Sequence, residues 1–332
     1  MLQPKHRVSQ ARRACHGAAA LALAALALGA AGQLARWFPV LDIFNFASPL
    51  GLLLALDSLV VLALGRKRRG AIFVTALALC AVAFSTERII PEYWRAAAPA
   101  ASAASRNVVI LTANVWRNNS APADAARTIA ASGADVVVLQ EASGIFNVSH
   151  AQLAKAFPYE TKCRVTKCEL VIFSRWPLDP VRYRYRARDG AQIGPSLIHT
   201  RVRPPGSPSF AIVTLHFPRI NGFGGVPADI PVELAQTVPS FMESHMIIAG
   251  DLNLTPWTFA LQQLDQGLAP MTRITGKSPS YPGNLDIFGV TVPAVMPIDH
   301  IYVGPSWLVR SVETLRIPGA DHRAVRAVLQ PI

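Results

Sequence analysis

Three apolar stretches occupy the first hundred residues of this 332-residue chain, and they limit its possible folds more than any other feature. They run from about 15 to 34, from about 44 to 64 and from about 71 to 90. A helix that crosses the hydrocarbon layer of a bilayer needs about 20 apolar residues. The third stretch reaches this length only by including Glu87 and Arg88. We therefore predict an N-terminal membrane region, residues 1–95, with about three transmembrane helices.

The first stretch has a second interpretation, as a signal peptide that is cleaved from the mature protein. Basic residues precede it and small residues stand near Gly29–Gly32, as in such a peptide. The two further apolar stretches favour a retained span, and the sequence leaves both interpretations open.

Basic residues predict the orientation of this region. Residues 1–105 carry eleven Lys and Arg against four acidic residues, so much of the net charge of +12 lies beside the apolar stretches. These basic residues gather before the first stretch and at Arg66–Arg69, whereas the loop between the first two stretches holds only Arg36 and Asp42. Because cytoplasmic loops carry the excess of Lys and Arg, both basic clusters are expected in the cytoplasm. Three crossings then place the C-terminal part outside the cell membrane, in the periplasm or the extracellular space.

One acidic residue, Asp57, falls inside the second stretch. An ionisable residue within a span is a candidate functional group. The alternative is an acid that faces the other helices or lies near a helix end beside Ser58, and its role stays open. With no other charge inside a span core, a transport function is not favoured.

An Ala/Ser/Pro linker at 96–105 leads into residues 106–332, whose mixed composition is that of a globular domain. Short apolar runs with few helical segments between them favour a layered α/β or α+β domain. We predict strands at Asn107–Trp116, Val136–Gln140, Leu170–Ser174, Leu197–Val202, Phe210–His216, Met246–Gly250, Ile301–Val303 and Ala324–Leu329.

Polar side chains stand at the ends of these predicted strands, where α/β enzymes assemble a site from distant parts of the sequence. In the Asp251–Asn253 pair, the period of two would direct both side chains to the same side if the strand geometry continues. Each residue alone is a weak signal, because acids and histidines at strand ends are often structural. Together they predict one site, built from Asn114, Glu141, His216, Asp251, Asn253, Asp299, Asp321 and His322.

The motifs LTANVW, VVLQE, VTLH, GDLNLTPW, IDHIYV and ADHRAV, in this order, resemble those of the endonuclease/exonuclease/phosphatase superfamily. The resemblance covers about Asn107 to Leu329. It implies a four-layer sandwich of two β-sheets flanked by helices. It also implies a hydrolase that uses Mg²⁺ or Mn²⁺ to cleave phosphodiester or phosphomonoester bonds. The substrate class stays open between nucleic acid, as for a nuclease, and a phospholipid or its headgroup.

The resemblance also implies which residues bind the metal. Glu141 matches the acidic Mg²⁺ ligand, Asn114 the amide beside metal and phosphate, and Asp321 an additional ligand. Carboxylate oxygens suit Mg²⁺, a hard cation. Ala320 stands where a serine is frequent in the family, and no substrate-binding Arg or Tyr of the family can be placed.

The remaining matches carry catalytic roles in the family. His216 matches the histidine that contacts the scissile phosphate, and Asp251 the acid that activates or aligns the attacking water. Asn253 matches the amide that holds the phosphate. Asp299 and His322 match an Asp–His pair that stabilises the transition state. No G-x-S-x-G motif or P-loop suggests a different chemistry.

A basic strip offers a candidate substrate-binding surface. On a strand, alternate residues share one face, so four guanidinium groups would lie together. They would bind phosphates of a polyanion or of anionic lipid, although a solvated strand face explains the pattern equally well. The strip consists of Arg182, Arg184, Arg186 and Arg188.

Two cysteines in the C-terminal domain, Cys163 and Cys168, are close in sequence. No second Cys/His pair lies nearby, so a metal site is not favoured. Outside the cytoplasm a disulfide is favoured over free thiols, and we predict a Cys163–Cys168 bond.

A second function of a different class stays open. The domain could be a catalytically inactive binding module that is tethered to the membrane and keeps the same fold. The intact acidic and histidine set argues against this alternative. No protein partner can be inferred.

The flanking charges generate a prediction about topology. A reporter fused after Ile332 should be active only if it works outside the cytoplasm, because three crossings invert the side of the chain. Alkaline phosphatase and green fluorescent protein fusions would be compared. Fluorescence of the cytoplasm-dependent reporter at this position would contradict the three-span topology.

Overall fold

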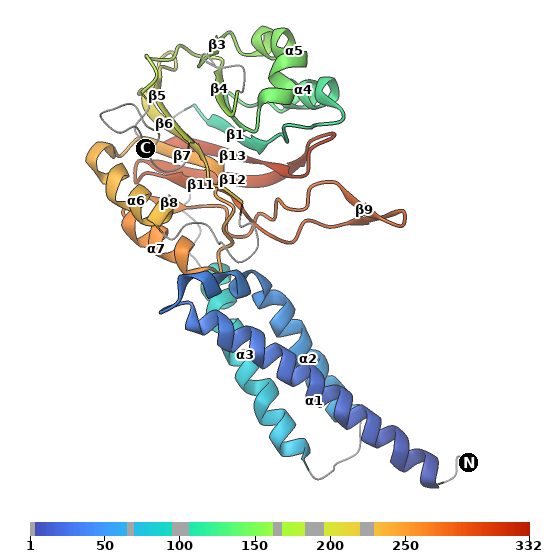
Figure 1. The fold of residues 1–332 in the computed structure, drawn as a ribbon. Coiled ribbons are helices and arrows are strands. Elements are labelled where there is room, and N and C mark those ends of the chain that lie inside the picture. The colour runs from blue at the N-terminus through green and yellow to red at the C-terminus, as the bar shows by residue number, and fades with distance from the viewer. Residues whose placement is uncertain (1–3, 65–69, 95–105, 162–167, 183–195, 220–228) are drawn as a thin grey trace. The chain divides into compact units, whose positions relative to one another are not determined.

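The computed structural model describes residues 4–64, 70–94, 106–161, 168–182, 196–219 and 229–332 (Figure 1). It divides into two compact units, which are described separately. The first, the helical unit, comprises Met1–Arg95 with Ile220–Ala228 and Thr255–Gln262. The second, the sandwich unit, comprises Ala96–Arg219, Asp229–Leu254 and Gln263–Ile332.

The helical unit is built from three long helices and one short 3₁₀ helix. Small side chains such as Ala18, Ala22 and Ala78 are buried between the helices, and they allow close approach of the backbones. Three segments are long and apolar enough to cross a membrane, namely His16–Leu34, Pro39–Leu64 and Ala71–Trp94. The elements are α1 (Pro4–Leu34), η1 (Pro39–Ala47), α2 (Ser48–Leu64) and α3 (Ala71–Trp94).

Two acidic residues of this unit, Glu87 and Asp57, lie on its long helices. α3 continues past the acidic Glu87 and through Pro91, without a break where the apolar stretch ends. Glu87 pairs with Arg36 at an N–O distance of 2.6 Å. Asp57 is exposed on α2, so the idea that it faces the other helices is wrong.

The helical unit also includes the segment Thr255–Gln262, which Asp42 holds. The two carboxylate oxygens of Asp42 accept hydrogen bonds from the backbone N–H groups of Phe259 and Ala260, at 3.0 and 2.9 Å. These are the first residues of α7, so Asp42 does what an N-cap residue does, although it lies far away in the sequence. The guanidinium of Arg88 stacks 3.4 Å above the centre of the Phe259 ring.

The sandwich unit contains two mixed β-sheets. The first sheet has the order β12-β13-β1-β2-β4-β3 and the second β5-β6-β7-β11-β8. Among the strands of the described residues, β1/β2 and β6/β7 are the parallel pairs. The strands are β1 (Val108–Asn114), β2 (Val136–Gln140), β3 (Tyr159–Glu160), β4 (Leu170–Ser174), β5 (Ser196–Val202), β6 (Phe210–His216), β7 (Met246–Asp251), β8 (Thr272–Arg273), β11 (Asp299–Val303), β12 (Trp307–Arg316) and β13 (Arg323–Pro331), with a separate hairpin of β9 (Leu285–Ile287) and β10 (Val290–Val292).

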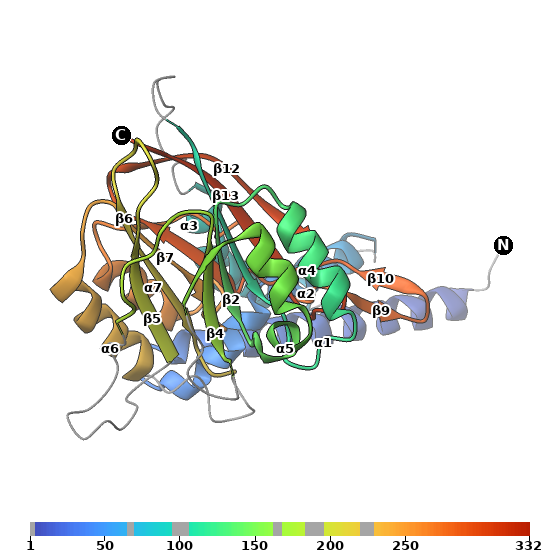
Figure 2. The same ribbon diagram turned by 90° about the horizontal axis from the view of Figure 1, so that it is seen from above.

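The core lies between the two sheets, because alternate residues of their strands face each other. Ile110 and Val138 of the first sheet and Ile212 and Ile247 of the second belong to one buried cluster. A second cluster lies on the outer face of the first sheet, under α4 (Pro122–Ala131) and α5 (Ser143–Ala156). The helix α6 (Asp229–Thr237) lies on the other side of the sheet pair (Figure 2). The predicted α/β sandwich of two sheets flanked by helices is confirmed.

Each predicted strand is present, and several further elements are not in the sequence prediction. β12 is ten residues long, but much of it is exposed and polar, so it lacks the apolar run by which the other strands were found. The helix α5 is interrupted at Ser149, whose φ of −130° is not helical. Its broken apolar periodicity explains why it was missed.

Gly250 occupies the centre of the second sheet, one residue before Asp251. A Cβ atom at this position would lie 2.0 Å from the carbonyl oxygen of Leu215 on the neighbouring strand β6. No side chain fits such a distance. Gly250 thus permits β7 to pair with β6 and β11 up to the residue at which the strand ends.

This close approach predicts that a methyl group at position 250 lowers the stability of the fold. Gly250→Ala should lower the free energy of unfolding by about 3 kcal/mol, because the strands must separate to admit the methyl group. At Gly289 in the β9–β10 hairpin, nothing lies within 4 Å of an added Cβ. There the same substitution should cost only about 1 kcal/mol, for a positive φ. Equal urea midpoints of the two variants would contradict this account.

Candidate active site

Strand register brings three of the predicted residues together at one edge of the second sheet. In the parallel pair β6/β7, His216 lies opposite Asp251. In the antiparallel pair β7/β11, Asp251 lies opposite Asp299. The side chains come from parts of the chain far apart in sequence, and the hydrogen-bonded pairing fixes their spacing at that edge.

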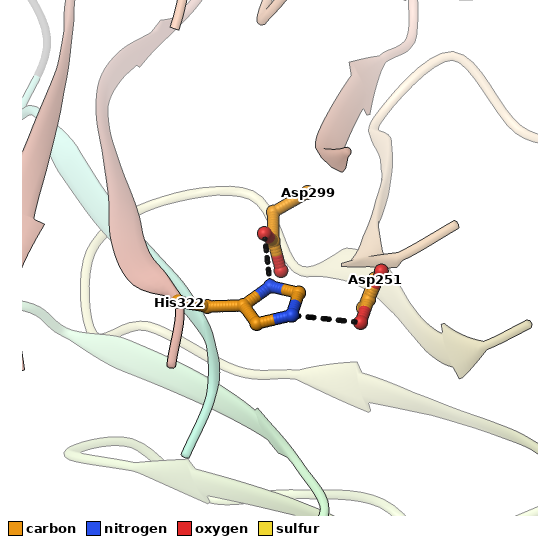
Figure 3. A group of neighbouring side chains, drawn as sticks. All are labelled: Asp251, Asp299 and His322. Atoms are coloured by element: carbon orange, nitrogen blue, oxygen red, sulfur yellow. Dashed lines mark hydrogen bonds and ion pairs between the residues drawn. The ribbon is translucent and has the colours of Figure 1, made fainter. Parts of the chain in front are cut away.

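His322, just before β13, lies between two of these carboxylates (Figure 3). Its Nδ1 is 2.8 Å from Asp299 Oδ2, and its Nε2 is 3.8 Å from Asp251 Oδ2. The side chains of both aspartates are fully buried and that of His322 is 1% exposed. Water therefore screens these charges little.

Burial lowers the pKa of His322, but the carboxylates of Asp299 and Asp251 outweigh burial and raise it to about 9. Burial also raises the pKa of Asp299, and the charge of Asp251 adds to this, whereas the imidazolium of His322 and a hydrogen bond from Ser280 lower it. Asp299 and His322 therefore compete for one proton, since both pKa values are raised. We assign the proton to His322, because two carboxylates face that single imidazole.

Asn114 and Glu141 join this group from the first sheet, at the ends of β1 and β2. Asn114 Nδ2 donates hydrogen bonds to Asp251 Oδ2 at 2.9 Å and to Glu141 Oε1 at 3.3 Å. One amide thus connects carboxylates from both sheets. Glu141 has a φ of 50°, a left-handed conformation that is unfavourable for glutamate and that turns the chain away as β2 ends.

Glu169 was not predicted, although it lies in the same site. Its Oε1 is 3.0 Å from His216 Nδ1. Burial lowers the pKa of His216, but this hydrogen bond and the charges of Asp251, Glu169 and Glu141 raise it above its ordinary value. Glu169 precedes β4, which is antiparallel to β2, so its start lies beside the end of β2.

Two arginines that sequence reasoning also missed contact Glu141. The Nε of Arg117 is 3.1 Å from Glu141 Oε2. One Nη of Arg219 is 3.4 Å from Glu141 Oε1 and 3.0 Å from Asp321 Oδ2. Burial raises the pKa of Glu141, but hydrogen bonds from Arg117 and Asn114 and the charge of Arg219 lower it below the ordinary value. Glu141 is therefore ionised at neutral pH.

Asn253 differs from the sequence expectation. β7 ends at Asp251, and Asn253 has a φ of 49°, so the strand geometry does not continue and the period of two does not apply. Instead the backbone N–H of Asn253 donates to Asp251 Oδ1 at 2.8 Å, and its side-chain amide donates to Phe217 O at 2.9 Å. Asn253 thus reaches the site through a turn.

Several buried polar atoms of this group have no hydrogen-bond partner within the described part of the chain. They are Asp299 Oδ1, Asp321 Oδ1, His216 Nε2 and His322 Nε2. Buried polar atoms are nearly always paired, so they fit a bound polar ligand. Ligand atoms of Asp251, Asp299 and His322 lie within 4.8 Å of one another and could hold a cation. The ionised Glu141, with Asp321 and Asn114, also fits a hard divalent cation.

Parts of the predicted site lie outside the described residues. Arg184, Arg186 and Arg188 lie outside the described residues, so the basic strip stays a prediction. Arg182 itself pairs with His199 through two backbone hydrogen bonds. Cys163 also lies outside. Cys168 is buried and disulfide-bonded, and the Cys163–Cys168 pairing stays a prediction.

The sequence model of the Endonuclease/Exonuclease/phosphatase family matches residues 111–322, and the chain belongs to this family. Members of the family are hydrolases that act on phosphoester bonds and generally depend on divalent metal ions. The matched range contains every residue of the group described above. The sequence has no significant match among curated proteins.

Solved structures share the fold. A Bacteroides vulgatus endonuclease/exonuclease/phosphatase superposes with a TM-score of 0.53 at 15% identity, over 68% of this chain and 100% of the other. The catalytic domain of human nocturnin, solved with bound sulfate, gives 0.52 at 15%, over 68% and 95%. D. rerio TDP2, in complex with a single-strand DNA product, gives 0.50 at 16%, over 67% and 98%. At such identities the likeness establishes the fold alone.

The raised pKa of His322 predicts how stability depends on pH in metal-free protein. Its folded-state pKa lies above the unfolded value of about 6.5. The stabilisation is therefore fully present below that value and is lost as pH rises through about 9. With EDTA present, the unfolding temperature should fall over this window in the wild type and change less in His322→Gln. His150→Gln, which removes a histidine that pairs with Glu160 instead, serves as control and should keep the wild-type slope. An equal slope for His322→Gln would contradict the ion pair.

Proposed function

We propose that this protein is a membrane-anchored, Mg²⁺-dependent phosphoesterase. It hydrolyses phosphodiester or phosphomonoester bonds, with its catalytic domain outside the cytoplasm. The observation that carries the proposal is the buried His322 between Asp299 and Asp251, in a group that also contains His216 and that Asn114 connects to Glu141. Family membership supports hydrolysis of phosphoesters, and the three long apolar helices support the anchor.

Glu141, Asn114 and Asp321 would hold the metal ion. Glu141 is ionised, and Asp321 keeps one buried oxygen without a partner among the described residues. His322 is a poor ligand, because its raised pKa keeps it protonated. We therefore prefer the ligand set around Glu141 to the Asp251–Asp299–His322 group. A divalent ion there would neutralise charge on the phosphate oxygens and act as a Lewis acid.

The chain's own residues account for the other requirements of phosphoester hydrolysis. Asp251 accepts hydrogen bonds from Asn114 and from the backbone of Asn253, and this fixed carboxylate can orient a water and accept its proton. His322, held by Asp299, presents a positive charge for the transition state. His216 is positioned by Glu169 and stays cationic more readily than a free histidine, so it can contact the phosphate.

The substrate class within this proposal is either a nucleic acid or a phospholipid or its headgroup. The single-strand DNA product in the TDP2 structure supports the first of these classes, and the sulfate in the nocturnin structure supports an anionic ligand. A membrane anchor favours substrates at or near a bilayer. The strip Arg182–Arg188 is proposed to contribute basic side chains to substrate binding.

The alternative is an inactive binding module of the same fold, tethered to the membrane. Loss of a carboxylate or histidine would favour it. Instead, Glu141, Asp251, Asp299 and His322 all converge, with buried atoms that face one another. Such a costly arrangement of buried charges is unusual in a site without chemistry.

The decisive measurement is activity of the full chain in detergent on DNA, RNA, phospholipids and phosphomonoesters, with and without Mg²⁺. Asp251→Asn and His322→Ala should each lower kcat by about 10²–10⁴-fold at any Mg²⁺ concentration. Glu141→Gln should instead raise the Mg²⁺ requirement and be partly rescued by excess Mg²⁺, because an amide is a poorer ligand.

Two comparisons complete this test. Asp179→Asn changes a carboxylate that pairs with Arg203 on the surface, and it should leave kcat unchanged. Asp299→Asn combined with His322→Ala should be little worse than either change alone, because the pair acts as a unit. Near-wild-type turnover of folded His322→Ala would overturn the assignment. Absence of activity on all four substrate classes would favour the binding module.

A further inference from the structure

Arg219 holds together two carboxylates at one edge of the first sheet, Glu141 at the end of β2 and Asp321 just before β13. It follows β6 by three residues, and one Nη atom contacts both Asp321 Oδ2, at 3.0 Å, and Glu141 Oε1, at 3.4 Å. The Arg219 side chain is 42% exposed, whereas Glu141 is 5% and Asp321 27% exposed. A partly solvated cation thus pairs with two acids that are more deeply buried.

These two acids are the ones assigned above as metal ligands. One cation that bridges them offsets the repulsion that would otherwise separate two carboxylates at close range. Arg219 does not satisfy the site completely, because Asp321 Oδ1 has no hydrogen-bond partner within the described residues. Oxygen ligands held together but incompletely satisfied are suited to receive a second, harder cation.

We propose that Arg219 is an exchangeable counter-ion, which rests on the function proposed above. It neutralises Glu141 and Asp321 while no divalent ion is bound, releases them to the divalent ion, and then binds the phosphate group of the substrate. A guanidinium is always charged at neutral pH, and its planar fork matches both a carboxylate and a phosphate. The same side chain can therefore serve both anions in turn.

Arg117 contacts Glu141 as well, but its geometry fits a fixed role. Both its backbone N–H, at 3.3 Å, and its Nε, at 3.1 Å, donate to Glu141 Oε2. Its guanidinium also lies 3.5 Å from Glu169. The hydrogen bond from its backbone N–H would keep Arg117 beside Glu141 even if its side chain moved. Arg219 alone of these two bridges both proposed metal ligands.

The exchange predicts opposite effects of one substitution on two ligands. In the full chain in detergent, Arg219→Gln should bind Mg²⁺ roughly three- to tenfold more tightly, because a competing, partly solvated cation is gone. In saturating Mg²⁺, the same variant should bind inorganic phosphate roughly tenfold more weakly, because a charge-assisted hydrogen bond is lost. Both affinities would be measured by isothermal titration calorimetry, without turnover.

Two further variants separate exchange from general charge. Arg203→Gln removes an equal charge from an exposed pair with Asp179, and both of its affinities should remain at the wild-type level. Arg219→Lys keeps the charge, so its Mg²⁺ affinity should stay close to the wild type while phosphate binds more weakly. This variant also serves if Arg219→Gln fails to fold.

Unchanged or weaker Mg²⁺ binding in Arg219→Gln would overturn the exchange. So would an equal gain in Mg²⁺ affinity in Arg203→Gln or Arg219→Lys, since the effect would then not depend on the charge at position 219. If the wild type binds no divalent ion at all, the proposed Mg²⁺-dependent function fails instead, and the two failures are distinguished in one titration series.

Discussion

The pairing of β7 with β6 on one side and β11 on the other is the constraint on which the site depends. It sets Asp251 opposite both His216 and Asp299, and a slip of one residue would turn each side chain to the other face. Gly250 permits this pairing by leaving room for the carbonyl of Leu215. Asn114 then connects the second sheet to Glu141 at the edge of the first. The positions of the site residues therefore depend on the register of the three strands β6, β7 and β11.

The charge of the site explains why such a group of acids is stable. Five carboxylates converge there, from Glu141, Glu169, Asp251, Asp299 and Asp321. Arg117, Arg219 and two imidazoles oppose them, and the raised pKa values of His216 and His322 follow from this excess of negative charge. A site that is slightly anionic on its own attracts a divalent cation and becomes attractive to a phosphate ester only once that cation is bound. Under the proposed function, electrostatics would therefore make the divalent ion bind before the phosphate ester.

The sequence predicted best where one physical signal dominates. Buried strands such as Val136–Gln140 are apolar throughout, and the polar residues that follow them stand out. The sequence did not predict elements and residues whose place is determined by contacts with distant parts of the chain. β12 is an exposed strand without an apolar run, and Glu169 reaches the site only because β4 runs antiparallel to β2. Arg117 and Arg219 lie in loops, and no periodicity marks a loop arginine whose partner is distant in sequence. The turn at Asn253 requires a positive φ. Asparagine tolerates this conformation, but an asparagine in the sequence does not by itself predict it.

The left-handed backbone at Glu141 has a consequence for substitutions at that position. A glutamate with a φ of 50° costs on the order of 1–2 kcal/mol relative to a residue without a Cβ atom. Glycine at position 141 would relieve this backbone strain, but it would also remove the carboxylate that accepts hydrogen bonds from Asn114 and Arg117. Under the proposed function, the backbone conformation and the metal site therefore make opposite demands on residue 141.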